Sequence, residues 1–375
     1  MNRQKSSGRF RFAGAAALLS LLFFLVPALR EGNATLYLLA AAVPCVLVLG
    51  CTLLARFFSL DRMLIAVSLY LCACGVAVLA PDAPEEALAQ GMRCCAGLLA
   101  LVIGGMLIRS LTPSLLTASC AGFLGLLVLS APLFSPQLDL PLSEAGLALV
   151  LLSVAALLSR GTLPALLPAA AALALLLIRR QTALAVLWGL ALLLLVYAAD
   201  GRLIIVLPVF AAVLCSVGGV PGFSPGNLPA PDPSSLQALA SAGLAGTETL
   251  PPELAAGSAS LFPPLTGRYG LIFAGFTGLL YLPLALRGTF IASAARTRFH
   301  ALLSMGVSLM LGLKTLLALL PLFGVLPLEE TALPLLTDSL PSLCAWMFLL
   351  GLQCGISGRN EADLAEDAHL AMLEK

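Results

Sequence analysis

The segment "ALLSMGVSLMLGLKTLLALLPLFGVLPLEE" (residues 301–330) combines a long apolar run with an abrupt break. The run contains a single charged residue, Lys314, and is long enough to cross the hydrocarbon core of a bilayer as a helix. Pro321, Gly324 and Pro327 then interrupt the helix while the surrounding side chains stay apolar. Irregular backbone at membrane depth needs a covering of protein or a water-filled cavity. The segment therefore predicts either a transmembrane helix broken at one membrane face, beside a cavity, or a helix that simply ends at proline at the interface.

The composition of the whole chain extends this interpretation. Of 375 residues, 60% are hydrophobic and 10% are charged, whereas soluble domains are roughly 45 to 50% apolar and about 25% charged. The composition therefore indicates an integral membrane protein. A net charge of +1 excludes the clustered basic surface that binding to nucleic acid requires. The expected partners are membrane lipids, lipid-linked substrates and other membrane proteins.

Apolar runs of spanning length predict an all-α, polytopic bundle of about 12 transmembrane helices. The predicted spans are residues 13–29, 34–57, 63–80, 94–108, 114–134, 145–158, 163–178, 182–199, 203–217, 269–286, 301–323 and 335–356. The ten cysteines all lie in apolar runs. They are expected to pack as small apolar residues, without disulfides or a zinc site.

Charged residues between the spans orient the bundle, because Lys and Arg are retained on the cytoplasmic side. The basic start "MNRQKSSGRFRF" places the N-terminus inside, and alternation places the acidic segments "PDAPEE", "SPQLDLPLSE" and "PLEE" outside. Both termini are therefore expected in the cytoplasm. The predicted organisation is a basic N-terminus (1–12), N-terminal helices (13–134), central helices (135–217), a large extracytoplasmic loop (218–268), C-terminal helices (269–356) and a cytoplasmic tail (357–375).

Two arginines depart from this charge pattern. Arg179 and Arg180, in "LLLIRRQTALAV", fall on the predicted outer side. They could extend to the lipid headgroups from the end of a helix. Alternatively, they bind an anionic group such as a pyrophosphate, to which Arg offers a planar bidentate fork.

Lys314 is the main charge inside a predicted span. A lysine in hydrocarbon costs on the order of 2.5 to 3.5 kcal/mol unless it reaches the interface or finds a partner. It lies about two helical turns before Pro321, too deep to reach the outer headgroups easily. We therefore expect Lys314 to face the bundle interior, with Asp338 as its carboxylate partner.

Chemistry-bearing motifs are few. The sequence contains no metal-ligand spacing, nucleotide-binding glycine loop or nucleophile elbow. A carboxylate mechanism remains if the protein is an enzyme. The long outer segment offers only Asp232, Glu248 and Glu253 for it.

Three segments carry a resemblance to a known family. "PLSEAGLALVLLSVAALL", with Ser143 and Glu144, is similar to a helix that begins Q-P-S-E, and "RRQTALAVLWGLALLLLVYAADGR" is similar to one that begins D-L-G-T-A. Gly324, Leu326 and Pro327 match G-x-x-L-P, with Pro321 before them. In this order, over roughly residues 85–356, the chain resembles the SEDS proteins (shape, elongation, division and sporulation), the family of FtsW, RodA and SpoVE.

The resemblance implies a fold and an activity. The fold is a 10-helix SEDS-like core preceded by about two extra N-terminal helices. The activity is glycan-strand polymerisation from lipid II at the outer face of the bacterial cytoplasmic membrane, in division, elongation or sporulation. The implied partner is a class B penicillin-binding protein. Cofactors stay undetermined, a divalent cation being one candidate.

Within that activity the residues take expected roles. A carboxylate deprotonates the acceptor sugar hydroxyl while a cation or arginine neutralises the departing pyrophosphate. Glu253 is the candidate base. Arg179 and Arg180, together with Lys314 and Asp338, are the candidate substrate-binding residues.

Departures from the family pattern keep other functions open. Gln181 and Thr182 stand where D-L-G-T-A has its Asp, and no lysine occurs one turn after Glu144, near Leu147. "TDSLPS" (residues 337–342) replaces S-Y-G-G-S-S, and no carboxylate stands at residues 258–260, where the family has an essential Asp. A catalytically degenerate scaffold for a penicillin-binding protein, or a flippase or transporter for lipid-linked sugars, therefore remains an alternative.

Overall fold

The computed structural model describes residues 34–58, 60–81, 83–111, 113–134, 142–201, 240–244, 246, 260–322 and 331–373, with scattered positions between 14 and 29. Within these ranges the chain forms eleven α-helices, and its only extended pairings are isolated bridges. The helices are α2 (Ala34–Phe57), α3 (Arg62–Leu79), α4 (Pro84–Ser110), α5 (Leu115–Phe134), α6 (Ser143–Leu158), α7 (Thr162–Ile178), α8 (Thr182–Asp200), α12 (Phe262–Leu279), α13 (Tyr281–Ser293), α14 (Arg298–Leu322) and α15 (Leu340–Leu373).

The fold is that of an all-α integral membrane protein, as predicted. Eight helical stretches in the described residues are long and apolar enough to cross a bilayer, and α6 and α7 are shorter apolar helices. The predicted span 13–29 is described only at scattered positions, and the predicted span 203–217 lies outside the described residues.

Several predicted helix boundaries are wrong, including the starts of α12 at Phe262 and of α15 at Leu340. Helix α4 begins ten residues before Cys94, at Pro84, because a proline in the first turn followed by Glu85 and Glu86 suits a helix N-terminus. Helix α13 continues to Ser293, beyond the predicted end of the span at residue 286, so Arg287 lies on this helix. Helix α15 runs to Leu373, because the tail is rich in Ala, Glu and Leu, which favour helix.

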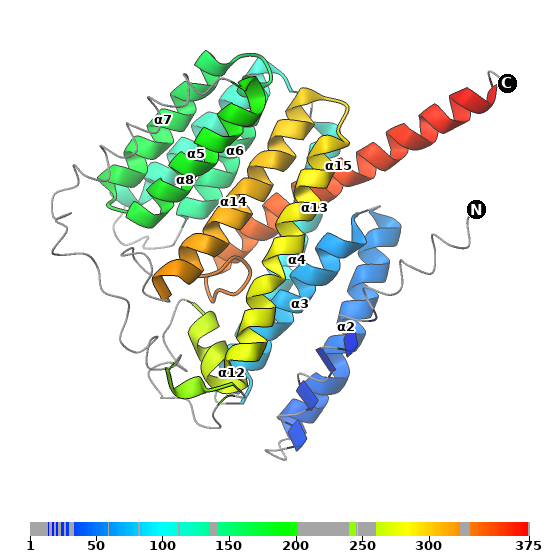
Figure 1. Ribbon diagram of the computed structural model, residues 1–375, viewed down its shortest axis with the longest axis vertical. Helices are drawn as coiled ribbons and strands as arrows, with labels where there is room; N and C mark the ends of the chain where they lie inside the picture. The colour runs from blue at the N-terminus through cyan, green and yellow to red at the C-terminus, as the bar shows by residue number, and fades with distance from the viewer. Residues whose placement is uncertain are drawn as a thin grey trace.

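Helices α14 and α15 run through the middle of the bundle (Figure 1). Helices α5 to α8 form one side, whereas α3, α4, α12 and α13 form the other, with α2 at the edge (Figure 1). Helix α15 packs along α4 and α6, and α14 packs against α6, α8 and α13. The last part of α15 projects beyond the bundle (Figure 1).

Glycines allow the closest helix pair to form. Gly351 and Gly355 on α15 face the backbone of α4. A Cβ atom at Gly351 would lie 2.1 Å from the carbonyl oxygen of Leu101, and one at Gly355 would lie 2.5 Å from that of Gly105. Small residues four apart let transmembrane helices approach this closely. The α4–α15 contact therefore depends on the absence of side chains at these two positions.

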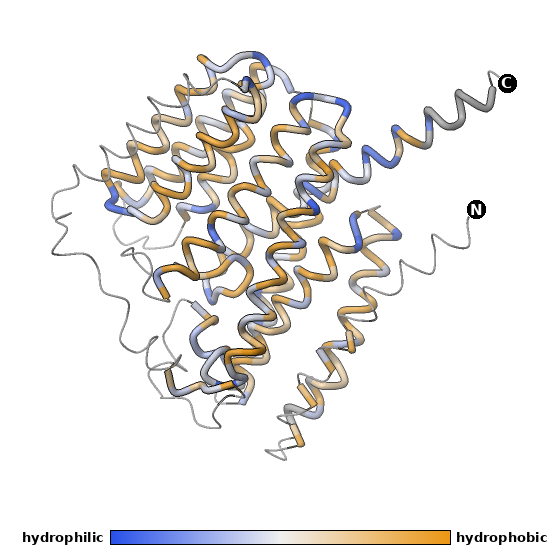
Figure 2. The backbone as a smooth tube through the Cα atoms, in the orientation of Figure 1, coloured by the Kyte–Doolittle hydropathy of each residue, from blue (hydrophilic) through white to orange (hydrophobic). Residues whose placement is uncertain are grey.

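The surface of the bundle has the distribution that a bilayer requires. Large apolar side chains such as Phe123 on α5 and Leu163 on α7 are 71% and 79% exposed. Figure 2 shows hydrophilic residues gathered mainly at helix ends and along the projecting part of α15. The described cysteines are all free, and Cys72, Cys74 and Cys354 are buried among apolar neighbours.

One end of the bundle gathers the N-termini of α4, α6, α8 and α12 with the loop of residues 331–339. Hydrogen bonds and a bridge join these elements at that end. The charge pattern of the sequence assigns this end to the exterior, and we call it the predicted outer end. Here α12 bends at Gly270, whose φ of 86° is a left-handed conformation that glycine adopts without strain.

Candidate functional site

A buried acid–base centre lies near the predicted outer end, between α6, α14 and α15. Glu144 forms an ion pair with Lys314, and the Nζ atom of Lys314 lies 2.7 Å from Oε1 of Glu144. The indole Nε1 of Trp346 donates to Oε2 of Glu144 at 2.8 Å, and the hydroxyl of Ser342 donates to the same oxygen. The Lys314 and Glu144 side chains are only 4% and 12% exposed. Both carboxylate oxygens therefore have partners.

Local sequence places each member of this Glu144–Lys314 centre. Glu144 lies in the first turn of α6, where the helix dipole favours a negative charge. Ser342 and Trp346 are four residues apart on α15 and therefore share one face of that helix. Charges inside a membrane protein persist when they are paired and hydrogen-bonded. The centre therefore ties three helices together through one carboxylate.

The structure confirms one part of the prediction for Lys314 and corrects another. Lys314 faces the interior, with 3% of its surface exposed. The prediction that Asp338 is its partner is wrong, because the ammonium group of Lys314 pairs with Glu144. The segment before α15 folds towards α4, and this leaves Asp338 in the field of Arg93 and Glu86 instead.

Arg179 reaches the edge of the same centre. One of its terminal nitrogens donates to the hydroxyl of Ser143 at 2.8 Å and to the carbonyl oxygen of Leu129 at 3.4 Å. Ser143 is buried and directly precedes Glu144. Arg180 is exposed and lies in the tight turn between α7 and α8, with φ of 56°. The two arginines therefore differ, since one is bonded to the bundle and the other is open to solvent or lipid.

The loop of residues 331–339 covers this end of the bundle. The buried amide of Gln90 on α4 donates to the carbonyl oxygen of Thr337 at 2.9 Å. Thr337 also forms an antiparallel bridge with Ser260, and the hydroxyl of Tyr281 donates to the carbonyl oxygen of Pro334. The loop is thus fixed from three directions. Ser260 stands where the resemblance implies an acid, and the bridge sets it beside the residue that precedes Asp338.

Asp338 is half-buried in this loop. Burial raises the pKa of its carboxyl above the ordinary value, while the positive charge of Arg93 acts in the opposite direction. A terminal nitrogen of Arg93 lies 3.7 Å from Oε2 of Glu86, and the other donates to Oε1 of Gln90 at 3.1 Å. Asp338 is therefore a carboxylate with an elevated proton affinity, four residues before Ser342 in the sequence.

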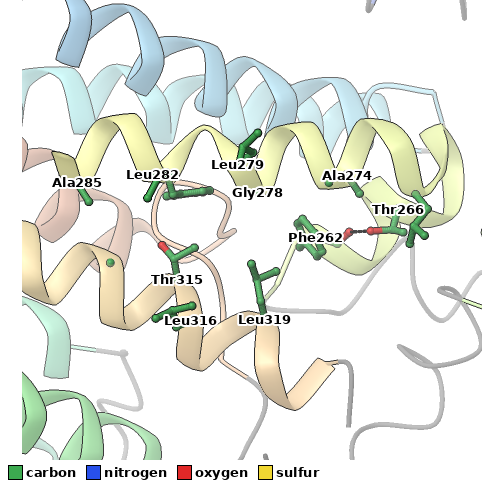
Figure 3. A pocket seen from close by; sticks show the side chains of 14 residues that line it. Phe262, Thr266, Ala274, Gly278, Leu279, Leu282, Ala285, Thr315, Leu316 and Leu319 are labelled. Atoms are coloured by element: carbon green, nitrogen blue, oxygen red, sulfur yellow. Dashed lines mark hydrogen bonds between the residues drawn. The ribbon is translucent and has the colours of Figure 1, made fainter. Parts of the chain in front are cut away.

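A lateral apolar groove opens between α12, α13 and α14 (Figure 3). Its volume is about 610 Å³. Small residues form much of its wall, namely Ala274, Gly275, Gly278, Ala285 and Gly312. Small residues let another helix approach closely inside a bilayer. The groove therefore has the character of a surface for a transmembrane helix.

The structure does not describe every predicted site residue. Glu253, Gly324, Leu326 and Pro327 are outside the described residues. Pro321 is buried near the C-terminal end of α14 as described. No group of three His, Cys, Asp or Glu side chains in the described ranges could hold a metal ion.

Sequence reasoning did not identify the roles of Ser342 and Trp346. Ser342 was visible as the last residue of "TDSLPS", and Trp346 follows one helical turn later, so both lie on the buried face of α15. A polar residue and an indole on the apolar face of a membrane helix, both able to donate hydrogen bonds, were the available signal.

These features define a polytopic helical membrane protein with a buried ion pair near one membrane face. No protein-family model matches the chain, and no curated protein matches it. Its fold is similar to that of a chain in a solved structure of a peptidoglycan synthase complex, described under the words "Structural coordination of polymerization and crosslinking by a peptidoglycan synthase complex". The TM-score is 0.62 and the identity is 19%, over 80% of this chain and 98% of the other. The likeness establishes a shared fold.

Proposed function

We propose that this protein is a SEDS-like peptidoglycan glycan-strand polymerase. It would act on lipid II at the outer face of the bacterial cytoplasmic membrane, with both of its own termini in the cytoplasm. One observation carries the proposal: nearly the whole length of a chain from a peptidoglycan synthase complex is matched by this fold. The motif residues Ser143 and Glu144 also support the proposal, because both take part in the buried network at the predicted outer end.

The cations at this end suit a lipid-linked pyrophosphate. Arg180 is exposed in the α7–α8 turn, and Arg179 lies one residue away with its guanidinium on Ser143. Arginine binds phosphate oxygens through a planar, bidentate fork. Lys314 is already held by Glu144, so in this proposal it orients α6, α14 and α15 around the substrate while the arginines neutralise the leaving group.

The lateral groove supports a partner with a transmembrane helix. Its wall of glycine and alanine residues on α12, α13 and α14 would allow close approach of one more helix. A class B penicillin-binding protein, the crosslinking partner that the resemblance implies, is the occupant we propose. Residues of α12, α13 and α14 line the groove (Figure 3).

The test is polymerisation of lipid II by the purified protein, co-expressed with its transpeptidase. The proposal predicts glycan strands when both proteins are present and no glycan strands from the transpeptidase alone. Absence of strands, with both proteins folded and associated, would contradict polymerase activity.

One observation favours a second candidate, a non-catalytic scaffold. Ser260 occupies a position where the resemblance implies an essential carboxylate. A scaffold would bind the partner through the lateral groove and need no base. In the same assay it would give a stable complex without glycan strands.

A further inference from the structure

Four carboxylates among the described residues lie at the predicted outer end, and they differ in how far they are engaged. Glu144 accepts from Lys314, Ser342 and Trp346. Glu86 is exposed and lies 3.7 Å from Arg93. Glu85 is exposed in the first turn of α4. Asp338 alone is half-buried and forms no ion pair with any described Lys or Arg.

The backbone around Asp338 is held more firmly than an ordinary surface loop. Thr337 is 1% exposed, is bridged to Ser260 and accepts from Gln90 at 2.9 Å. On the other side, the amide of Ser339 donates to the hydroxyl of Thr337 at 3.1 Å, and the amide of Ser342 donates to the hydroxyl of Ser339 at 3.4 Å. A reactive group needs such support, because small misplacements of a catalytic side chain are costly.

Asp338 is joined to the Glu144–Lys314 centre by a short stretch of chain. It precedes Ser342 by four residues, and the Ser342 hydroxyl donates to Glu144. Four residues of chain therefore separate the Asp338 carboxylate from a member of the buried network. A substrate bound over this end would meet Asp338 on the loop, whereas Glu144 is enclosed by its donors.

We propose that Asp338 is the general base of the polymerisation reaction, which rests on the proposed function. In that step the Asp338 carboxylate takes the proton of the acceptor sugar hydroxyl, and the hydroxyl oxygen forms a bond to the anomeric carbon of the donor sugar. The bond from that carbon to the pyrophosphate oxygen breaks, and its electron pair leaves with the lipid pyrophosphate. The proton on Asp338 then passes to water, which restores the carboxylate.

The electrostatics of the loop suit this role. A general base works best when its pKa lies near the working pH while its deprotonated form is still populated. Burial raises the pKa of Asp338, and the nearby negative charge of Glu86 acts in the same direction. Arg93 opposes both effects and keeps the carboxylate accessible in its charged form. Glu144 is less suited, since an ion pair and two donors occupy its oxygens.

The experiment compares Asp338→Asn, Asp338→Glu and the control Glu85→Gln in lipid II polymerisation by the purified complex. Glu85 is an exposed carboxylate at the same end and should leave the rate unchanged. We expect Asp338→Asn to lower kcat by roughly 10²- to 10⁴-fold, the usual contribution of a general base, while KM for lipid II holds. Asp338→Glu should retain part of the rate that Asp338→Asn loses, because it keeps a carboxylate that can accept the proton.

The pH profile adds an independent readout. Since the base acts when deprotonated, kcat/KM should rise with pH through the pKa of Asp338 and then level off. This acidic limb should move in Asp338→Glu and stay in place in Glu85→Gln.

Three results would overturn the inference. The first is a wild-type rate in Asp338→Asn, which would leave the polymerase function intact while removing this residue from it. The second is loss of activity in Glu253→Ala without loss in Asp338→Asn, which would return the role to Glu253. The third is a wild-type complex without polymerase activity, which would overturn the function and the inference together.

Discussion

Removal of Lys314 tests the buried centre most severely. Two unit charges 2.7 Å apart attract by about 6 kcal/mol at an effective dielectric constant of about 20, and desolvation offsets much of this. Breaking such a pair by removing one partner typically costs roughly 3 to 5 kcal/mol, because the remaining charge is buried alone. At about 2 °C per kcal/mol for a chain of this size, Lys314→Met should lower the midpoint of thermal unfolding by roughly 6 to 10 °C.

A double-mutant cycle separates the ion pair from packing. In Lys314→Met combined with Glu144→Gln, the amide oxygen still accepts from Trp346 and no charge remains buried. This double variant should recover to within about 1 kcal/mol of the wild type. The control is Thr315→Val, since the Thr315 hydroxyl bonds within its own helix, to Leu311. Thermal unfolding in one detergent is the assay. Additive effects of the two substitutions, with no recovery in the double variant, would refute the ion pair.

Three further predictions follow from topology, charge and packing. A cysteine introduced at Ser234 should react with an impermeant maleimide in intact cells, and protection until lysis would overturn the orientation. Changing Arg179 and Arg180 to Gln should weaken lipid II binding by roughly tenfold or more with normal expression; unchanged affinity would remove both from the substrate site. Gly351→Ala should sharply reduce the yield of folded protein, because its Cβ would lie 2.1 Å from a backbone oxygen of α4. The control Gly91→Ala should fold normally, because open space surrounds Gly91. Equal yields of the two variants would contradict the close α4–α15 contact.

Hydropathy was sufficient to predict the fold class. A run such as residues 301–323 must be helical in lipid, because no water is available to satisfy its backbone. The helix ends were less predictable. The amphipathic start of α4 and the polar extension of α15 carry charges, so hydropathy alone placed both boundaries inside the observed helices.

The contents of the candidate site were predictable in part. The cost of a charge in hydrocarbon was enough to turn Lys314 inward, and the Q-P-S-E-like segment marked Ser143 and Glu144 as notable. That Glu144 holds Lys314 was not predictable, because the pairing depends on the rotation and depth of α6 and α14 relative to each other. Asp338 was chosen because it lies at the start of the last predicted span, but the bridge between Thr337 and Ser260 directs its loop elsewhere.

The most direct test of the proposed polymerase is a single measurement: the glycan product formed from lipid II by the purified wild-type protein with its co-expressed transpeptidase, whose own crosslinking is blocked. The account predicts glycan strands whose formation requires this chain and is lost in Asp338→Asn. A folded, associated complex that leaves lipid II unconsumed would contradict the polymerase and favour the scaffold.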